Sequence, residues 1–269
     1  MGNDTGISAP AEFIASCEIV DLSVMIGDDY PCYWPTIMGY HASVFHRIGE
    51  WMGPFFTRYM IMEEHVGTHC DAPAHFIPTP ETGLPHASEH GRTTVEQVPL
   101  SQFIGPAVVV DCRSLRGKAK LGECPIISVD LLKEWEKKNG PFVRGDAVLL
   151  RTDWTDDTYR RMPEGKAFGH APILEKSAPG WPSPDYDAMT YLAEAGVRIV
   201  GHDGNSIGPL QNDGGPHWAG LGAGMVFVER LTRLGELPTR GALFVFLPIK
   251  CEGAGGAPGR AMAFRPRTP

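Results

Sequence analysis

The sequence predicts a single α/β domain with a substantial all-β portion. Short β-rich apolar runs recur along the chain, two segments between them have the end signals of helices, and no repeat or linker divides the chain. With 269 residues, 42% hydrophobic and 21% charged, the chain is long enough for one domain with a full core. We expect residues 1–16 to be a loose N-terminal arm and residues 17–269 to form the domain.

Seven β-rich runs are expected to be strands, and residues 41–48 alternate well enough to add another in the strand-dominated first half. The seven runs are residues 17–24, 57–65, 106–112, 146–154, 197–203, 242–249 and 260–264. The apolar runs are strand-length and too short to span a bilayer, so no membrane segment is expected.

Two helices are expected between these strands. One follows Ser128 as N-cap and ends before Gly140. The other has Ser183 as N-cap, Pro184 at the first helical position and Asp185 in the first turn. Each precedes a strand by about six residues, which favours βαβ-like units in a mixed sheet.

Composition excludes several classes of function. The net charge of −8 and the absence of a Lys/Arg cluster argue against nucleic-acid binding. The first residues have neither the basic nor the apolar part of a secretory signal, and the six cysteines form no C-x-x-C pair. We therefore expect reduced thiols and a cytoplasmic location.

The stretch EEHVGTHCDAPAHF, residues 63–76, concentrates side chains that bind metals. His65, His69, Asp71 and His75 are separated by even numbers of residues, so an extended backbone would direct all four to one face. Two imidazoles and a carboxylate suit Zn²⁺, Mn²⁺ or Fe²⁺ and leave positions open for water. The extra histidine, His75, is then placed as a general base or proton carrier. The alternative, in which these three histidines and one aspartate are solvated residues of a surface loop, does not account for the common register.

The segment HVGTHCDAPAH resembles the H-x-G-T-H-x-D-x-P-x-H signature of the metal-dependent cyclase-family hydrolases. That family includes bacterial kynurenine formamidase, isatin hydrolase and the metal-dependent trans-dienelactone hydrolase. The resemblance extends from IVDLS near the start to LPIKCEGAGGAPGRAMAF near the end. It implies a swivelling β/β/α fold and a homo-oligomer, a dimer or tetramer. It also implies His65, His69 and Asp71 as metal ligands and His75 as the catalytic proton carrier.

A second pair of residues resembles the formamidase branch. His217 and Glu229 are twelve residues apart, and in that branch a histidine and a glutamate with this spacing complete a second metal site. Asp71 would then bridge two ions, since a carboxylate has two oxygens. In the alternative, Glu229 pairs with Arg230 or Arg233 on a helix. The sequence leaves one and two ions open.

Aromatic residues precede the metal motif. In enzymes like isatin hydrolase the region equivalent to GEWMGPFFTRYM helps to wall the pocket, which implies substrate contacts for Trp51, Phe55 and Phe56. Their alternative role is ordinary core. His202 and Asp203 lie at the end of a predicted strand, where ligands tend to bind in α/β folds. Asp203 is expected either to orient a ligating histidine or to act directly in the site, and His202 is expected to contact the ligands without binding the metal.

Together these patterns predict an enzyme that uses water activated by Mn²⁺ or Zn²⁺ to hydrolyse a small molecule. The substrate is expected to be a cyclic amide such as isatin or an aryl formamide such as N-formylkynurenine. The alternatives are a lactone hydrolase of the trans-dienelactone type and a non-catalytic metal- or ligand-binding protein on the same fold. The chain has no G-x-S-x-G elbow and no dinucleotide fingerprint, which disfavours an acyl-enzyme route and a nicotinamide site.

Overall fold

The computed structural model describes residues 9–32 and 34–267. Part of the expected N-terminal arm, residues 1–8, lies outside these ranges. Residues 9–16 differ from the expectation because they form helix α1 (Ala9–Ser16), and the ring of Phe13 lies 6.2 Å from that of Phe264. No helix among the described residues is long and apolar enough to cross a membrane.

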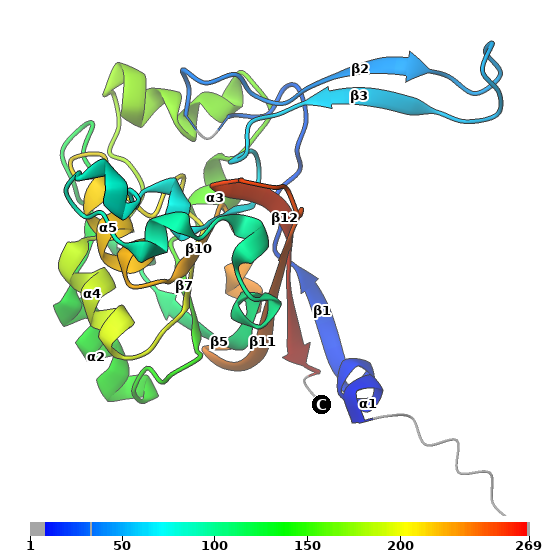
Figure 1. Cartoon of the computed structure of the whole chain (residues 1–269). Helices are drawn as coiled ribbons and strands as arrows, with labels where there is room; N and C mark the ends of the chain where they lie inside the picture. The colour runs from blue at the N-terminus through cyan, green and yellow to red at the C-terminus, as the bar shows by residue number, and fades with distance from the viewer. Residues whose placement is uncertain (1–8, 33, 268–269) are drawn as a thin grey trace, which may run out of the picture.

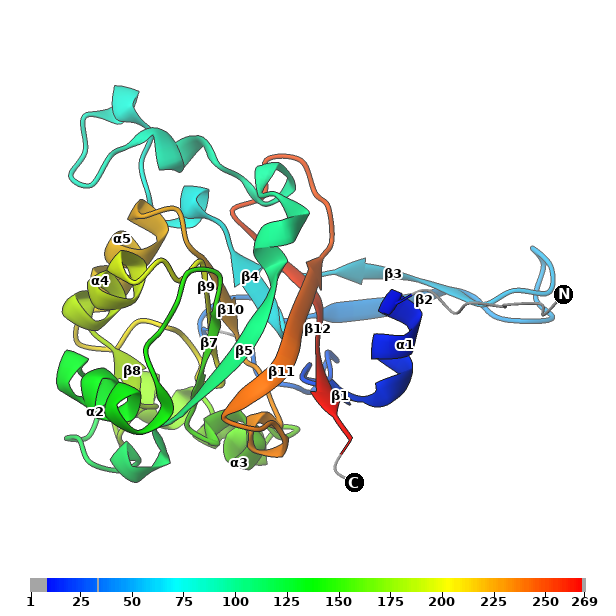
Figure 2. The same cartoon turned by 90° about the horizontal axis from the view of Figure 1, so that it is seen from below.

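One eight-stranded mixed sheet organises the protein (Figures 1 and 2). Its order is β1-β12-β11-β5-β7-β9-β10-β4. The neighbours β5, β7, β9 and β10 are parallel, and the remaining pairings are antiparallel. The strands are β1 (Cys17–Asp21), β4 (His69–Asp71), β5 (Ile104–Asp111), β7 (Ala147–Arg151), β9 (Ile199–His202), β10 (Val226–Glu229), β11 (Arg240–Pro248) and β12 (Gly256–Pro266).

The sheet closes on itself because β12 is long. Its first residues pair with β4, at Gly256 opposite Asp71, and its last residues pair with β1 along the same edge. Seven strands thus form a barrel-like ring, to which β1 is added outside the circuit. The α/β class with a mixed, strand-rich sheet and flanking helices is confirmed.

The helices cover the parallel part of the sheet (Figure 1). They are α2 (Val129–Asn139), α4 (Tyr186–Glu194) and α5 (Gly214–Gly222), with a short α3 (Trp154–Thr158) after β7. Alternate residues of the strands divide between two cores, as the two-residue period of a strand requires. In β5, Ala107 and Val109 belong to the core inside the ring, whereas Val108 and Val110 belong to the core beneath the helices.

The helix ends show one prediction confirmed and one wrong. Ser128 caps α2 by accepting the backbone N–H of Leu131. The second helix begins later than expected, because Asp185 caps it by accepting the N–H of Ala188. Ser183 and Pro184 instead form strand β8, which pairs with β6 (Ile126–Ile127). The Ser183 hydroxyl donates a hydrogen bond to the carbonyl of Ile207 and does not cap the helix.

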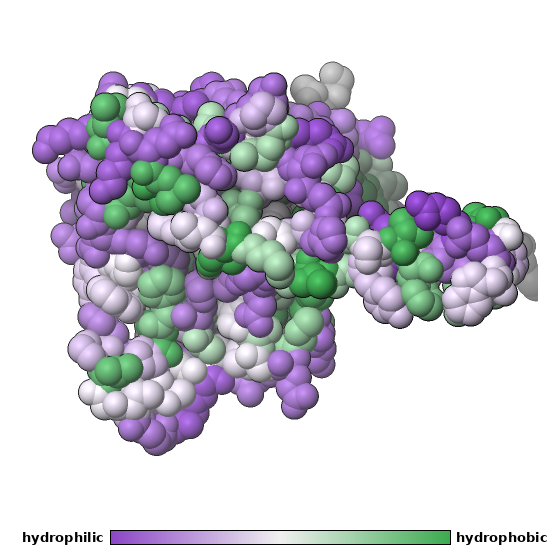
Figure 3. Space-filling model, turned by 90° about the horizontal axis from the view of Figure 1, so that it is seen from above, coloured by the Kyte–Doolittle hydropathy of each residue, from purple (hydrophilic) through white to green (hydrophobic). Residues whose placement is uncertain are grey.

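A two-stranded hairpin projects from the body (Figures 1 and 2). It consists of β2 (His41–His46) and β3 (Thr57–Ile61), which pair with each other and with no other strand among the described residues. We call residues 41–61 the arm. Many of its apolar side chains are exposed, among them Ile48, Trp51, Phe55, Phe56, Tyr59, Met60 and Ile61. Figure 3 shows the arm standing away from the body, with apolar residues on its surface.

Candidate metal centre

The candidate ligands meet where β4 and β10 lie side by side. The antiparallel register puts Glu229, the last residue of β10, directly opposite His69, the first residue of β4. Asp71 follows two residues later on β4 and therefore faces the same side. His217 approaches from α5, and all four side chains are almost fully buried.

The metal motif was expected to be extended from His65 to His75, but it is extended only over β4 (His69–Asp71). Gly67, in the left-handed region at φ 63°, forms a turn that brings in His65. Pro73 begins a 3-10 turn that ends at His75. The four side chains still converge, because the turns on either side of β4 fold back toward it.

Two histidines face one oxygen of Asp71. The Nε2 atoms of His65 and His69 lie 3.4 and 3.5 Å from Asp71 Oδ1, and His69 Nε2 also lies 3.4 Å from Glu229 Oε2. One ligand atom each from His69, Asp71 and Glu229 lies within 4.8 Å of the others, and the same holds for His65, Asp71 and His75. Each spacing is suited to donors that share a cation.

The other oxygens of the two carboxylates face His217. Its Nε2 lies 3.9 Å from Asp71 Oδ2 and 3.8 Å from Glu229 Oε1. Glu229 Oε1 also accepts the backbone N–H of Ile207 at 2.6 Å, which fixes the carboxylate. Asp71 and Glu229 each present one oxygen to the histidines of the motif and one to His217. This arrangement is suited to a pair of ions bridged by Asp71.

The three imidazole rings are oriented by acceptors at their Nδ1 atoms. Glu63 Oε1 lies 2.7 Å from Nδ1 of His65, the carbonyl of Gly67 lies 2.9 Å from that of His69, and the carbonyl of Asp213 lies 2.7 Å from that of His217. An acceptor at Nδ1 selects the tautomer whose Nε2 lone pair points to the carboxylates. Supporting contacts of this kind are typical of metal-binding histidines.

The electrostatics of this cluster also fit a divalent cation. Asp71 Oδ1 is buried and accepts no hydrogen bond from the described residues. Burial and the neighbouring Glu229 raise the pKa of Asp71. Burial opposes protonation of His217, but Glu229 outweighs it and raises the pKa of His217 to about 9. Buried carboxylates this close together require compensating positive charge, which a divalent cation supplies.

A cavity of about 280 Å³ opens onto the cluster. His75 lies at its wall, with its ring 4.1 Å from that of His65. Burial, together with His65 and His217, lowers the pKa of His75 to about 2, so its ring is neutral at physiological pH. The remaining lining residues outside the cluster are Trp34, Ile37, Phe76, Ser206 and Asp213. The cavity therefore combines apolar walls with a few polar groups, as small-molecule sites generally do.

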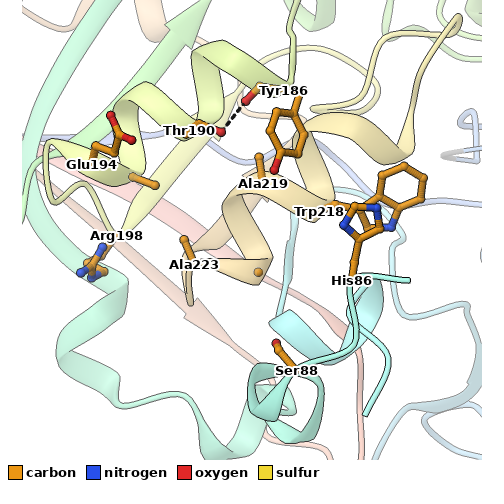
Figure 4. Close-up of a pocket in the computed structure, with 11 residues that line it drawn as sticks. His86, Ser88, Tyr186, Thr190, Glu194, Arg198, Trp218, Ala219 and Ala223 are labelled. Atoms are coloured by element: carbon orange, nitrogen blue, oxygen red, sulfur yellow. Dashed lines mark hydrogen bonds between the residues drawn. The ribbon is translucent and has the colours of Figure 1, made fainter. Parts of the chain in front are cut away.

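A larger and more open cavity, of about 490 Å³, lies between α4, α5 and the loop that carries His86 (Figure 4). The His86 ring stacks on Trp218 with centroids 4.5 Å apart, and Arg198 lies on the other side of the cavity. Among the described residues, none of the three-residue groups suited to a metal lines it. The smaller cavity is the candidate active site.

Several residues around the metal motif lie elsewhere, or make other contacts, than the sequence led us to expect. Trp51, Phe55 and Phe56 lie on the arm and do not line the cavity within one chain. Glu229 belongs to a strand, not a helix. Asp203 does not orient a ligating histidine, since its carboxylate accepts the backbone N–H groups of Thr152 and Asp153.

Sequence reasoning missed several residues of the cavity. Phe76 directly follows the motif, and its ring stacks on His217 at 4.1 Å. Ile37 precedes the arm, and no periodicity marks it, whereas Trp34 is one of the aromatic residues noted before the metal motif. Ser206 and Asp213 lie in the loop that leads from β9 to His217, so nearness to a candidate ligand was the available signal.

A closed mixed sheet with a buried cluster of histidines and carboxylates defines a candidate metalloprotein of the α/β class. A family model described as putative cyclase matches residues 20–209, and the chain belongs to this family. It is 29% identical to isatin hydrolase of Roseibium aggregatum over 93% of this chain and 92% of that protein. It is 30% identical to kynurenine formamidase of Paracidovorax citrulli over 78% and 79%.

Solved structures give the same family. Isatin hydrolase A from Ralstonia solanacearum superposes with a TM-score of 0.77 at 26% identity, covering 98% of this chain and all of that one. A structure described as a potential metal-dependent hydrolase with cyclase activity superposes with a TM-score of 0.64 at 25% identity, covering 94% of this chain and all of that one.

Proposed function

We propose that this protein is a metal-dependent hydrolase that opens a small cyclic amide of the isatin type or cleaves an aryl formamide. The convergence of His65, His69, His217 and Glu229 on the two oxygens of Asp71 carries the proposal. The similarity to isatin hydrolase and kynurenine formamidase over most of the chain supports the substrate class.

The cofactor in this proposal is Mn²⁺ or Zn²⁺, and two ions are favoured. His65, His69 and Asp71 would hold the first, and His217, Glu229 and the second oxygen of Asp71 would hold the other. Nitrogen and oxygen donors of this kind suit both metals. A bound ion would polarise the amide carbonyl and lower the pKa of water.

His75 is the proposed proton carrier. Its ring lines the cavity 4.1 Å from that of His65, within reach of water held at the cluster. The water oxygen adds to the carbonyl carbon, the C–N bond breaks, and His75 returns the proton to the departing nitrogen. Trp34, Ile37 and Phe76 hold a flat substrate and exclude bulk water from this exchange.

We also propose that the working form is a homo-oligomer, a dimer or tetramer, in which the arm packs on a second copy of the chain. An isolated two-stranded hairpin is marginally stable in water, and this one exposes Trp51 by 80% and Phe56 by 55%. An apolar groove at its base, lined by Met25, Met60, Leu247 and other residues, is continuous with the arm and extends the apolar surface. In such an assembly Trp51, Phe55 and Phe56 reach a substrate only through the neighbouring copy.

The cytoplasm is the proposed location. All six cysteines are free, and four of them are buried, which supports a reducing compartment. Hydrolysis of a small molecule needs no nucleic-acid or membrane partner.

The proposal is tested by loading the purified chain with Mn²⁺ or Zn²⁺ and following isatin and N-formylkynurenine by absorbance. We expect one of them to be hydrolysed, and His69→Ala to lower kcat/KM by roughly 10³-fold or more with loss of bound metal. His69 is the informative position because it faces both carboxylates.

His90→Ala is the matched control, since His90 is exposed and lies outside the cluster. A His69→Ala variant that keeps both metal and activity would refute the metal mechanism. Hydrolysis of lactones alone would identify the protein as a lactone hydrolase of the trans-dienelactone type.

A further inference from the structure

The cavity has a polar corner that the proposed metal and proton chemistry does not use. Ser206 and Asp213 line it, and neither belongs to the clusters suited to a metal. Both come from the loop between β9 and α5. Asp213 occupies the N-cap position of α5, but its side chain makes no capping hydrogen bond to the helix. Aspartate is favoured at N-cap positions because its side chain can accept a backbone N–H of the helix. The Asp213 side chain accepts none, so it is free to serve a different role.

Ser206 holds the Asp213 carboxylate in place. Its hydroxyl accepts the N–H of Gly208 at 3.0 Å and so donates its own proton to Asp213 Oδ1, 3.1 Å away. The carbonyl of Ser206 accepts Nε1 of the buried Trp181 at 2.6 Å, which fixes the loop. A side chain at position 208 would put its Cβ 2.0 Å from Asp213 Oδ1, so only glycine permits this approach.

Asp213 serves the site through two separate groups. Its backbone carbonyl accepts Nδ1 of His217, whereas its carboxylate lies at the cavity wall. The Asp213 side chain is only partly exposed, so water solvates its carboxylate less fully than it solvates a surface carboxylate. A poorly solvated acceptor gains more from a ligand N–H than an acceptor in water does.

We infer that Asp213, oriented by Ser206, accepts a hydrogen bond from the N–H of the scissile amide and so selects amides over lactones. The inference rests on the proposed function and narrows its substrate class. Cyclic amides and aryl formamides both have an N–H beside the carbonyl. A lactone has an oxygen there, whose lone pairs face the carboxylate without a proton between them. Sites built to bond an N–H or O–H strongly reject analogues that lack it.

The test compares isatin with N-methylisatin, which differs by replacement of the ring N–H. If formamides are the active branch, formanilide and N-methylformanilide are the pair. We expect wild-type kcat/KM to favour the N–H substrate by roughly 10²-fold. Asp213→Leu, similar in size but unable to accept a hydrogen bond, is expected to bring the ratio to within about threefold of one. Ser206→Ala is expected to give an intermediate ratio.

Two controls separate this role from folding and metal loading. Bound metal is measured in every variant. It should be retained, because the backbone of Asp213 still orients His217 after the side chain is changed. Asp187→Leu, at an exposed position in the first turn of α4, makes the same substitution outside the cavity and should leave the ratio unchanged.

The outcomes separate this inference from the proposed function. A wild-type ratio near one, a ratio that Asp213→Leu leaves unchanged, or an equal loss toward both substrates overturns the role of Asp213 while leaving an amide hydrolase. A wild-type protein that hydrolyses no amide of either kind overturns both. Collapse of the ratio in Asp213→Leu, with metal retained, supports the inference.

Discussion

The metal cluster and the arm reverse the usual distribution of side chains in opposite ways. Around β4 and β10 the protein buries polar groups: His69, Asp71 and Glu229 are each at most 3% exposed. On the arm it exposes apolar groups, of which Trp51 at 80% is the extreme. Soluble proteins seldom bury histidines and carboxylates together or expose a continuous apolar surface without a purpose.

Each region lacks a group that would complete it. Buried carboxylates require compensating charge, which bound cations would supply, and the exposed aromatics lack an apolar surface, which a second copy would supply in the proposed oligomer. The rigid ring of strands sets the geometry of the first region. The second depends on a hairpin that pairs only with itself.

After His69→Ala, the next largest effect is expected from His217→Ala, which removes a ligand from only one half of the metal cluster. His65 and His69 still face Asp71 in this variant, so the bound metal should fall from two ions per chain to one. We expect kcat/KM to fall by roughly 10- to 100-fold. Metal analysis by mass spectrometry, together with the hydrolysis assay, measures both changes.

Trp218→Ala is the control for His217→Ala, since Trp218 is the next residue of α5 but lines the other cavity (Figure 4). It should keep two ions. Retention of two ions by His217→Ala itself would contradict the bridged arrangement and favour a single-metal site.

A smaller effect is expected from Trp51→Glu on the arm. In a lone chain the substitution is nearly neutral, within about 0.5 kcal/mol, because Trp51 is exposed. In an oligomer built on the arm it puts a charge into an apolar interface, and light scattering should show a fall to the monomer mass. If residues of the arm line the cavity of the neighbouring copy, kcat/KM should also fall by about tenfold.

Leu121→Glu makes the same kind of change at an exposed residue of the body and should leave the mass unaltered. A wild-type protein that is monomeric at working concentrations would remove the proposed role of the arm.

The smallest effect concerns His202, which is as buried as the candidate ligands but whose Nε2 bonds to the carbonyl of Pro182 at 2.8 Å. Burial lowers the pKa of His202 to about 4. Below an unfolded-state pKa of about 6.5, the unfolded chain binds a proton that the folded chain refuses. Stability from this group is therefore complete above pH 6.5 and lost as the pH falls toward 4, by roughly 2 kcal/mol at pH 5.

Urea unfolding of the wild type and His202→Gln at pH 7.5 and pH 5 isolates this contribution, because other titrating groups cancel between the two proteins. The variant should lose less stability on acidification. Equal losses in the two proteins would mean that His202 does not titrate in this window.

Local sequence patterns predicted the local features well. Ser128 and Gly140 bound α2 as expected, because a cap depends on residues within one turn. The resemblance of HVGTHCDAPAH to the family signature is confirmed by the match over residues 20–209. The prediction of Ser183 as the N-cap of α4 was wrong, because the pairing of β8 with β6 places Ser183 and Pro184 in a strand and leaves Asp185 to cap the helix.

Sequence patterns alone predicted the class of fold, the family and the short segment that contains His65, His69, Asp71 and His75. Only the tertiary structure placed Glu229 opposite His69, closed the ring through β12 and brought Asp213 to the cavity. It also showed that Trp51 stands on an arm outside the cavity of its own chain. The physical reason is range: caps and turns are set by neighbours in sequence, whereas these placements join segments far apart in sequence and follow from strand order and register.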